Sequence, residues 1–413
     1  MAVSISSTPS LYSPAYNDIV FVVTSPLRTQ ANFRYIADVY VSGESMIRLP
    51  LLPHPTYGTG AFNVGRILET FVNSDISKST YGFQQNLNSY KSFYVKFGEE
   101  YGAATSGTTV FPNQVTSSTI YAWNSEIPFL TFQDYDYTDY VAQPSGGLVA
   151  TRLLTNQPTT VKIRDSEDAW MHVMSDTSGT VYYANVVTKD SAGATIQDIK
   201  IENPYQALTS TNHRFVRFGC GTANLNSIPS SGITGGSQPI ITASVASYTL
   251  AFTKYTGSAV TNTQTFTIDN TCTKNVTYRF HFLNKVGGFD SFTFIRGSVK
   301  DVDIKRSNYK KVSGGLTSAS TYGYNKYDRG DVSYFTQLRD GIKVKSDWLS
   351  ESESDWLEEL ITSPEVYLDD ATHGLVAVNI KNPNYKFKQT AQDKMIQLEI
   401  DFEYSFNRYR QRG

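Results

Sequence analysis

The sequence predicts a mainly β protein, made of two or three β-sandwich-like modules with a few short helices. Its 413 residues exceed what one hydrophobic core usually fills, which indicates more than one domain. Its 28 tyrosines and 23 phenylalanines favour pleated sheets over helical bundles. Apolar and polar residues alternate with period two in many segments, as they do in half-buried strands. We therefore expect several sheets around more than one core.

The first expected module spans residues 1–150 and is β-rich with one helix. Apolar residues alternate over residues 33–41 and again over residues 93–97, which predicts strands. From Asn63 onward the apolar spacing changes to i, i+3, i+4 and i+7, with Asn63 available as the N-cap. This spacing predicts a short amphipathic helix near residues 63–72.

The second expected module, residues 151–239, is a β meander. Its short alternating segments are separated by Ser-Gly and Asp-Ser pairs, which are typical of turns. Residues 226–239 are rich in Ser, Gly and Pro and contain few apolar side chains. This composition predicts an exposed loop or linker at the end of the module.

The third expected module, residues 240–413, is β-sandwich-like. Ser350 and Glu353 have the spacing of a capping box, and an apolar stripe follows them, so a helix is expected near residues 351–361. The clearest strand pattern lies at residues 396–406, where apolar and polar residues alternate without a break. This strand should be well buried in its module.

The charge of the chain argues against nucleic acid as its main partner. The formal net charge is −2, whereas binding to a phosphate backbone needs a basic face. The first ten residues lack the basic and apolar regions of a secretion signal, and no run of about 18 apolar residues occurs. We therefore expect no secretion and no membrane span. Cys220 and Cys272 are expected to be free thiols, although the sequence leaves their pairing open.

Motifs that carry chemistry are missing from the sequence. The five histidines are far apart, and none has a zinc-ligand spacing. Residues 219–224 begin like a dinucleotide-binding loop but lack its third glycine, and no G-x-S-x-G elbow occurs. We therefore predict no catalytic residue, no cofactor and no metal ion.

Paired carboxylates are the one generic route to catalysis that the sequence leaves open, because glycoside hydrolysis needs only two acids at a defined separation. Asp301 and Asp303 alternate with Val302 and Ile304, as solvent-facing acids on a strand would. We interpret all the candidate acids as structural. They are Glu99, Glu100, Asp134, Asp136, Asp139, Asp301 and Asp303.

Two segments are candidate interfaces. In the first, acids alternate with tyrosines, a pattern that would suit calcium, a sugar or a protein partner, and we favour the protein partner. The second is the basic end of the chain, which could contact DNA or an acidic partner, or be a solvated tail. The candidate residues are Asp134, Tyr135, Asp136, Tyr137, Asp139, Tyr140, Arg408, Arg410 and Arg412.

Several segments of the sequence are similar to a known group of proteins. They are residues 57–69, 95–102, 282–294 and 348–368, together with the acidic and aromatic strand near the C-terminus. In these segments the chain resembles structural proteins from the tail, neck or baseplate of tailed bacteriophages that infect Bacteroidetes, including the crAss-like phages. The resemblance implies a multi-copy subunit of a tail, tail hub, baseplate or neck ring.

The resemblance also implies partners and a location. The partners would be copies of this chain and other virion proteins, and the location would be the virion after synthesis in the host cytoplasm. A second hypothesis is a carbohydrate- or receptor-binding module of the virion that contacts a host surface glycan, because tyrosine-rich loops suit sugars. A glycan hydrolase is the third hypothesis, and only the generic presence of acids supports it. Ring symmetry and position in the particle stay open.

Overall fold

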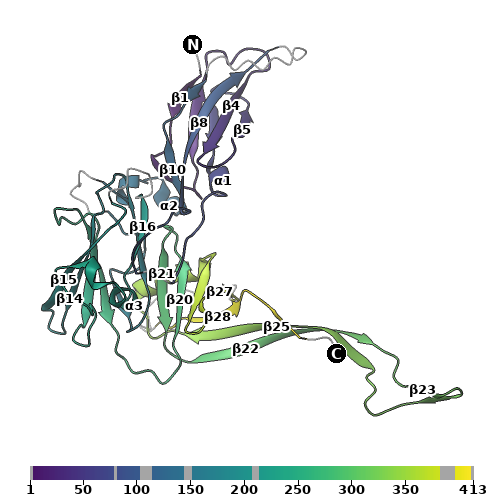
Figure 1. Ribbon diagram of the computed structural model, residues 1–413. Coiled ribbons are helices and arrows are strands. Elements are labelled where there is room, and N and C mark those ends of the chain that lie inside the picture. The colour runs from purple at the N-terminus through teal and green to yellow at the C-terminus, as the bar shows by residue number, and fades with distance from the viewer. Residues whose placement is uncertain are drawn as a thin grey trace. The chain divides into compact units, whose positions relative to one another are not determined.

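A computed structural model describes residues 3–78, 81–102, 114–143, 151–206, 214–381 and 396–410. The described chain is mainly β, with several sheets and a few short helices, so the predicted fold class is confirmed (Figure 1). The chain divides into two compact units. Unit 1 comprises Met1–Asn270 and Leu283–Asp290, and unit 2 comprises Thr271–Phe282 and Ser291–Gly413.

The N-terminal half of unit 1 consists of two sheets that share one hydrophobic core. Alternate side chains of both sheets, including Phe21, Val95 and Phe97, are buried in it. The smaller sheet has the order β1-β3-β6, with β1 at Ser4–Ser7, β3 at Val20–Thr24 and β6 at Gly60–Asn63. The larger has the order β2-β10-β8-β4-β5, with β2 at Tyr12–Pro14, β10 at Ile120–Trp123, β8 at Tyr90–Glu100, β4 at Arg34–Val41 and β5 at Ile47–Leu51, and β9 at Val115–Thr116 pairs with β8.

The predicted helix after Asn63 is present but short, as α1 at Gly65–Leu68. Asn63 does stabilise its start, because its Oδ1 accepts a hydrogen bond from the Gly65 N–H at 3.1 Å, although the N-cap position is Val64. A Cβ on Gly65 would lie 2.5 Å from the carbonyl oxygen of Asn17. Glycine is therefore needed for the chain to begin the helix so close to its own N-terminal segment.

The second half of unit 1 also has two sheets around one core, which contains Val173, Val186 and Phe252. The first sheet has the order β11-β13-β16-β7, with β11 at Val141–Ala142, β13 at Trp170–Ser175, β16 at Phe215–Gly219 and β7 at Gly82–Gln85. The second has the order β12-β19-β18-β14-β15-β17, with β12 at Thr160–Ile163, β19 at Gln264–Ile268, β18 at Ser247–Thr253, β14 at Tyr183–Lys189, β15 at Thr195–Glu202 and β17 at Ile233–Thr234.

The segment 226–239 is mostly exposed, as its composition predicted, but it is a loop of this half rather than a linker between modules. It follows α3 at Thr222–Asn226 and contains η3 at Ser230–Gly232 and the strand β17, which pairs with β15. The side-chain amide of Gln238 donates to the carbonyl oxygens of Leu225 and Ile228 at 2.9 and 2.6 Å. Since β18 and β19 also join this sheet, the expected module boundary between residues 239 and 240 falls inside unit 1.

A buried turn at Leu283–Asp290 returns the chain to unit 1 after unit 2 has begun. The Asn284 side chain organises this turn, since its Nδ2 donates to the Leu154 carbonyl and to Asp290 at 3.0 Å each. Its Oδ1 accepts from the N–H groups of Val286 and Gly288 at 3.1 and 2.9 Å. A Cβ on Gly287, whose φ is +79°, would lie 2.2 Å from the Asn124 carbonyl oxygen. Only glycine therefore fits this position.

Unit 2 is built on one sheet of order β21-β20-β26-β27-β28-β25-β22. From β20 to β22 in this order, each strand is antiparallel to the next. Buried residues of the sheet, including Phe280, Ile342 and Phe402, share a core with Trp356, Leu357 and Leu360 from two short helices. The sheet strands are β20 at Tyr278–Leu283, β21 at Phe289–Phe294, β22 at Ser298–Lys310, β25 at Asp331–Lys345, β26 at Val366–Asp370, β27 at Gly374–Ile380 and β28 at Glu399–Tyr404, and the helices are α4 at Glu351–Trp356 and α5 at Glu358–Thr362.

Two local predictions for unit 2 are confirmed. The capping box forms, because the Glu353 N–H donates to Ser350 Oγ at 3.2 Å and the Ser350 N–H donates to Glu353 Oε2 at 2.8 Å. The terminal strand is also present, and Ile400 and Phe402 are buried. Its pattern weakens at the end, since Phe406 is 54% exposed.

A buried histidine in unit 1 should make the chain sensitive to acid. His172 lies on β13 with a fully buried ring, and its Nδ1 accepts from the Phe289 N–H at 3.3 Å. Burial, with a smaller contribution from Arg217, lowers the pKa of His172 to about 3. The unfolded chain therefore binds a proton near an ordinary pKa of about 6.5, whereas the folded chain does not. Hence stability falls with falling pH.

We expect the free energy of unfolding to fall by up to about 1.4 kcal/mol per pH unit through this residue as the pH drops from about 6.5 towards 3. Urea titrations between about pH 4 and pH 7 should show a shallower dependence in His172→Gln than in the wild type. Val173→Ala on the same strand should lower stability at every pH and keep the wild-type slope. A wild-type slope in His172→Gln would contradict the prediction.

A candidate assembly surface on the arm of unit 2

The most unusual feature of unit 2 is a long β-hairpin, which we call the arm, residues 298–345. Its strands β22 and β25 pair from Ser298 with Val344 to Lys310 with Asp331. At about 3.3 Å per residue this ribbon is roughly 40 Å long. Figure 1 shows the ribbon running past the rest of the unit 2 sheet towards β23 at Gly315–Ser318, which pairs with β24 at Thr321–Gly323.

Only the base of the arm belongs to the sheet. Residues Gly341–Lys345 of β25 pair with β28, and Gln337 and Leu338 pair with β29 at Arg408–Tyr409. From Asp331 to Phe335, β25 pairs with β22 alone among the described strands. A two-stranded ribbon has no sheet or helix to pack on, and by itself it is only marginally stable in water. Among the described residues, the part of the arm beyond its base therefore lacks the strand neighbours that stabilise the rest of unit 2.

Apolar and aromatic side chains along the arm are exposed. The exposed fractions are 78% for Val312, 76% for Leu316, 75% for Tyr324 and 80% for Tyr327. Large contiguous apolar surface is unusual on a monomer and marks interaction sites. The other exposed members are Val299, Val302, Ile304, Tyr309, Tyr322, Tyr334 and Phe335.

The distal arm, residues 305–331, is also basic. It carries two acids, Asp328 and Asp331. Its six basic residues, all exposed, are Lys305, Arg306, Lys310, Lys311, Lys326 and Arg329. Exposed tyrosines next to arginines are typical of the residues that contribute most to protein–protein binding. The distal arm therefore offers large exposed side chains for contact and a net positive charge.

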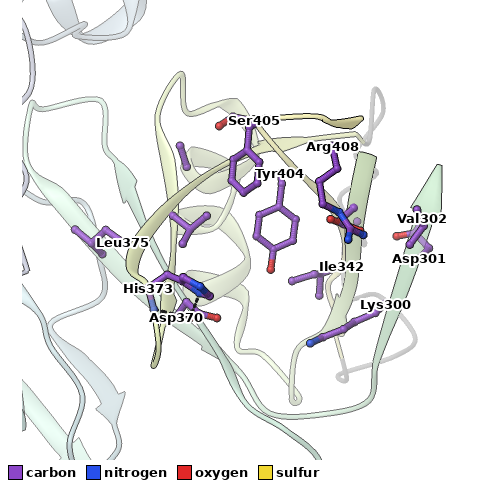
Figure 2. Close-up of a pocket in the computed structure, with 15 residues that line it drawn as sticks. Lys300, Asp301, Val302, Ile342, Asp370, His373, Leu375, Tyr404, Ser405 and Arg408 are labelled. Atoms are coloured by element: carbon purple, nitrogen blue, oxygen red, sulfur yellow. Dashed lines mark hydrogen bonds and ion pairs between the residues drawn. The ribbon is translucent and has the colours of Figure 1, made fainter. Parts of the chain in front are cut away.

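A groove of about 820 Å³ lies at the base of the arm (Figure 2). Its lining is mostly apolar and includes Val302, Ile342, Leu375, Val376, Tyr404 and Phe406. Burial, together with the nearby carboxylate of Asp370, raises the pKa of Tyr404, so its hydroxyl stays protonated. The groove thus offers an apolar surface with a neutral polar group.

Two pairs of charged or titratable groups line the groove. The Arg408 guanidinium binds Asp340, and His373 Nδ1 lies 2.9 Å from Asp370 Oδ1. Backbone N–H groups of His373 and Thr372 lower the pKa of Asp370, which identifies this carboxylate as the cap of the β26–β27 turn. Figure 2 shows Ser405 and His373 at separate ends of the groove, so the two do not form a nucleophile and base pair.

The predicted basic end of the chain lies on the arm. Arg408 is in β29, opposite Leu338 of β25, and the backbone N–H of Arg410 donates to the Thr336 carbonyl at 3.2 Å. Arg412 lies outside the described residues. The structure therefore brings two of the three predicted arginines to the arm, which the sequence did not indicate.

The tyrosines of the other predicted interface, residues 134–140, pack against other parts of unit 1. The Tyr135 hydroxyl donates to the Tyr12 carbonyl at 2.9 Å, and burial raises the pKa of Tyr135. Tyr137 stacks on Tyr12 with ring centroids 5.7 Å apart, and Tyr140 packs on Trp123 at 5.9 Å. The acids Asp134, Asp136 and Asp139 are exposed. An interface at this loop would therefore use carboxylates rather than tyrosine faces.

The sequence reading missed an exposed apolar pair beside this loop. Phe129 and Leu130 in α2, at Phe129–Phe132, are 75% and 84% exposed. Pro128 precedes them as the N-cap residue. The sequence did not indicate this pair, because a helix of four residues is too short to show a repeating apolar pattern.

The remaining candidate acids are not gathered into one site. Glu99 is fully buried and accepts from the Ser25 hydroxyl, whereas its neighbour Glu100 pairs with Arg34. Asp301 and Asp303 are exposed on β22, and Asp301 lies 4.0 Å from Lys381. Within the described ranges no three His, Cys, Asp or Glu side chains could hold one metal ion. Both cysteines are thiols, with Cys220 buried and Cys272 exposed.

No family model matches the sequence, and no curated protein matches it. Among the described helices, none is long and apolar enough to cross a membrane.

The exposure of the arm predicts that unit 2 folds without it. In a short-arm variant, residues 307–335 are replaced by Asn-Gly, a dipeptide that forms tight hairpin turns, between the cross-strand partners Arg306 and Thr336. We expect the melting temperature to change by less than about 4 °C, the shift that about 1 kcal/mol produces. Thermal unfolding followed by circular dichroism measures this.

The matched control is Ile342→Ala in the part of β25 that is buried, where the loss should be about 2–5 kcal/mol. If the short-arm variant lost as much stability as Ile342→Ala, the arm would have to be part of the core of unit 2.

Proposed function

We propose that this protein is a structural subunit of a multi-copy assembly, and specifically of the tail, tail hub, baseplate or neck ring of a tailed phage virion. Its partners would be copies of itself and other virion proteins. The observation that supports this proposal most strongly is the arm, whose aromatic and basic side chains stay exposed among the described residues even where its tyrosines contact one another. The sequence resemblance to phage structural proteins supports the choice of assembly.

The arm has the physical properties of an assembly element. Its base is fixed by pairing with β28, so the direction of the arm is set before any partner binds. Pre-organisation lowers the entropy that must be lost on association. Its tip carries rigid tyrosines, which add contact area with few rotatable bonds. Charges along β22 also discourage unspecific pairing of an open strand edge.

A glycan-binding role for the arm tip is the second candidate. Tyr324 and Tyr327 are exposed there, and aromatic faces can stack on sugar rings. In that case the tip would contact a host surface glycan, while the base of the arm still belongs to the subunit. The glycan hydrolase hypothesis gains no support, since the candidate acids are dispersed.

Incorporation into particles tests the proposal. Mass spectrometry of purified particles of the encoding phage should detect several copies of the chain per particle. When the short-arm variant is the only source of the protein, its amount per particle should fall at least tenfold while its level in the cell is unchanged. This follows because the arm would supply contact area that no other surface replaces.

Two outcomes would contradict the proposal. Absence of the wild-type chain from purified particles would remove the virion assignment. Normal incorporation of the short-arm chain, with loss of binding on a glycan array, would assign the arm to glycan recognition instead.

A further inference from the structure

Unit 2 carries a segment whose charge is opposite to that of the distal arm. Residues 346–380 contain no lysine and no arginine. Their nine acids are Asp347, Glu351, Glu353, Asp355, Glu358, Glu359, Glu365, Asp369 and Asp370. The whole chain has a formal net charge of only −2, so the separation of charge between this segment and the distal arm is pronounced.

Three exposed residues in and just before α4, which we together call the α4 surface, belong to this acidic segment: Trp348, Glu351 and Asp355. Trp348 is 47% exposed, and both acids are exposed. Glu351 and Asp355 are four residues apart in α4, so they lie on the same face of the helix. The buried Trp356 and Leu357 anchor the other face in the core of unit 2. The α4 surface therefore has a fixed position and combines an aromatic ring with negative charge.

We propose that the distal arm of one copy docks on the α4 surface of a second copy. This inference rests on the proposed function, because only a multi-copy assembly supplies the second copy. Lysines and arginines of the arm would face Glu351 and Asp355, and exposed tyrosines of the arm would pack against Trp348. Opposite charges at an interface speed association and select the partner. Aromatic contacts would supply buried area.

A second copy fits this role better than the same copy. The strands β22 and β25 stay paired from the base of the arm to Lys310 and Asp331, and Figure 1 shows this ribbon extending away from the rest of the unit 2 sheet. A fold-back of the arm onto its own α4 surface would have to break this pairing. Each copy instead offers one arm and one acidic surface, which are different patches. Such a head-to-tail contact generates a ring when the rotation closes and a filament when it does not.

Two variants that cannot associate alone should associate with each other. The first is the short-arm variant, which keeps the α4 surface. The second is Glu351→Lys with Asp355→Lys, which keeps the arm. We expect each to be monomeric in mass photometry, and we expect the mixture to form a one-to-one dimer that cannot grow. Raising the salt concentration from about 0.05 to 0.5 M should weaken the dimer at least tenfold, because screening shortens the reach of charges.

The matched control reverses two exposed acids of unit 1, Glu44→Lys with Glu126→Lys. This variant should self-associate with the wild-type dissociation constant, whereas Glu351→Lys with Asp355→Lys should raise that constant at least tenfold. Wild-type oligomers without a dimer in the mixture would overturn the docking proposal and leave the proposed function standing. A wild-type chain that stays monomeric and is absent from particles would overturn both. Arm-dependent binding of DNA or RNA, without the mixed dimer, would overturn the docking proposal in favour of nucleic acid.

Discussion

The backbone pairing of β25 with both β22 and β28 is the constraint on which the rest of unit 2 depends. At its C-terminal end β25 contributes Ile342 and Val344 to the core, and at its N-terminal end it is half of an exposed ribbon. The same strand therefore belongs both to a packed sheet and to a ribbon without a core of its own, so the sheet holds the base of the ribbon in place. Because the base is fixed, the distal side chains occupy a limited volume, which makes them suitable for recognition.

Local features of the fold could be predicted from the sequence because they depend on neighbours along the chain. The capping box of Ser350 and Glu353 and the alternation at Ile400 and Phe402 are of this kind. Alternation also indicates β22, where Val302 and Ile304 alternate with Asp301 and Asp303. It could not show that both faces of this strand are exposed, because a period of two reports strand geometry and not what covers the strand.

The positions of the candidate interface residues depend on contacts between segments far apart in the sequence. These positions could therefore not be predicted from the sequence. The tyrosines at 135, 137 and 140 suited an interface by composition, yet their rings pack on Tyr12 and Trp123, which are distant in sequence. The arginines at the chain end were identified as an interface without their location, because only strand pairing places Arg408 beside Leu338. Residues 226–239 have the composition of a linker, but hydrogen bonds from Gln238 hold them in unit 1. Composition reports average solvent exposure, whereas these positions are set by specific partners.

The interleaving of the two units also orders the events of protein synthesis. The turn at Leu283–Asp290, with Asn284 at its centre, completes unit 1, and it precedes the arm in the chain. The ribosome therefore finishes the last piece of unit 1 before it makes β22 or β25. The arm emerges only after all of unit 1 has been made, and its base pairs with β28 only when that later strand has been made as well. The arm of a nascent chain therefore has no fixed direction until β28 has been synthesised.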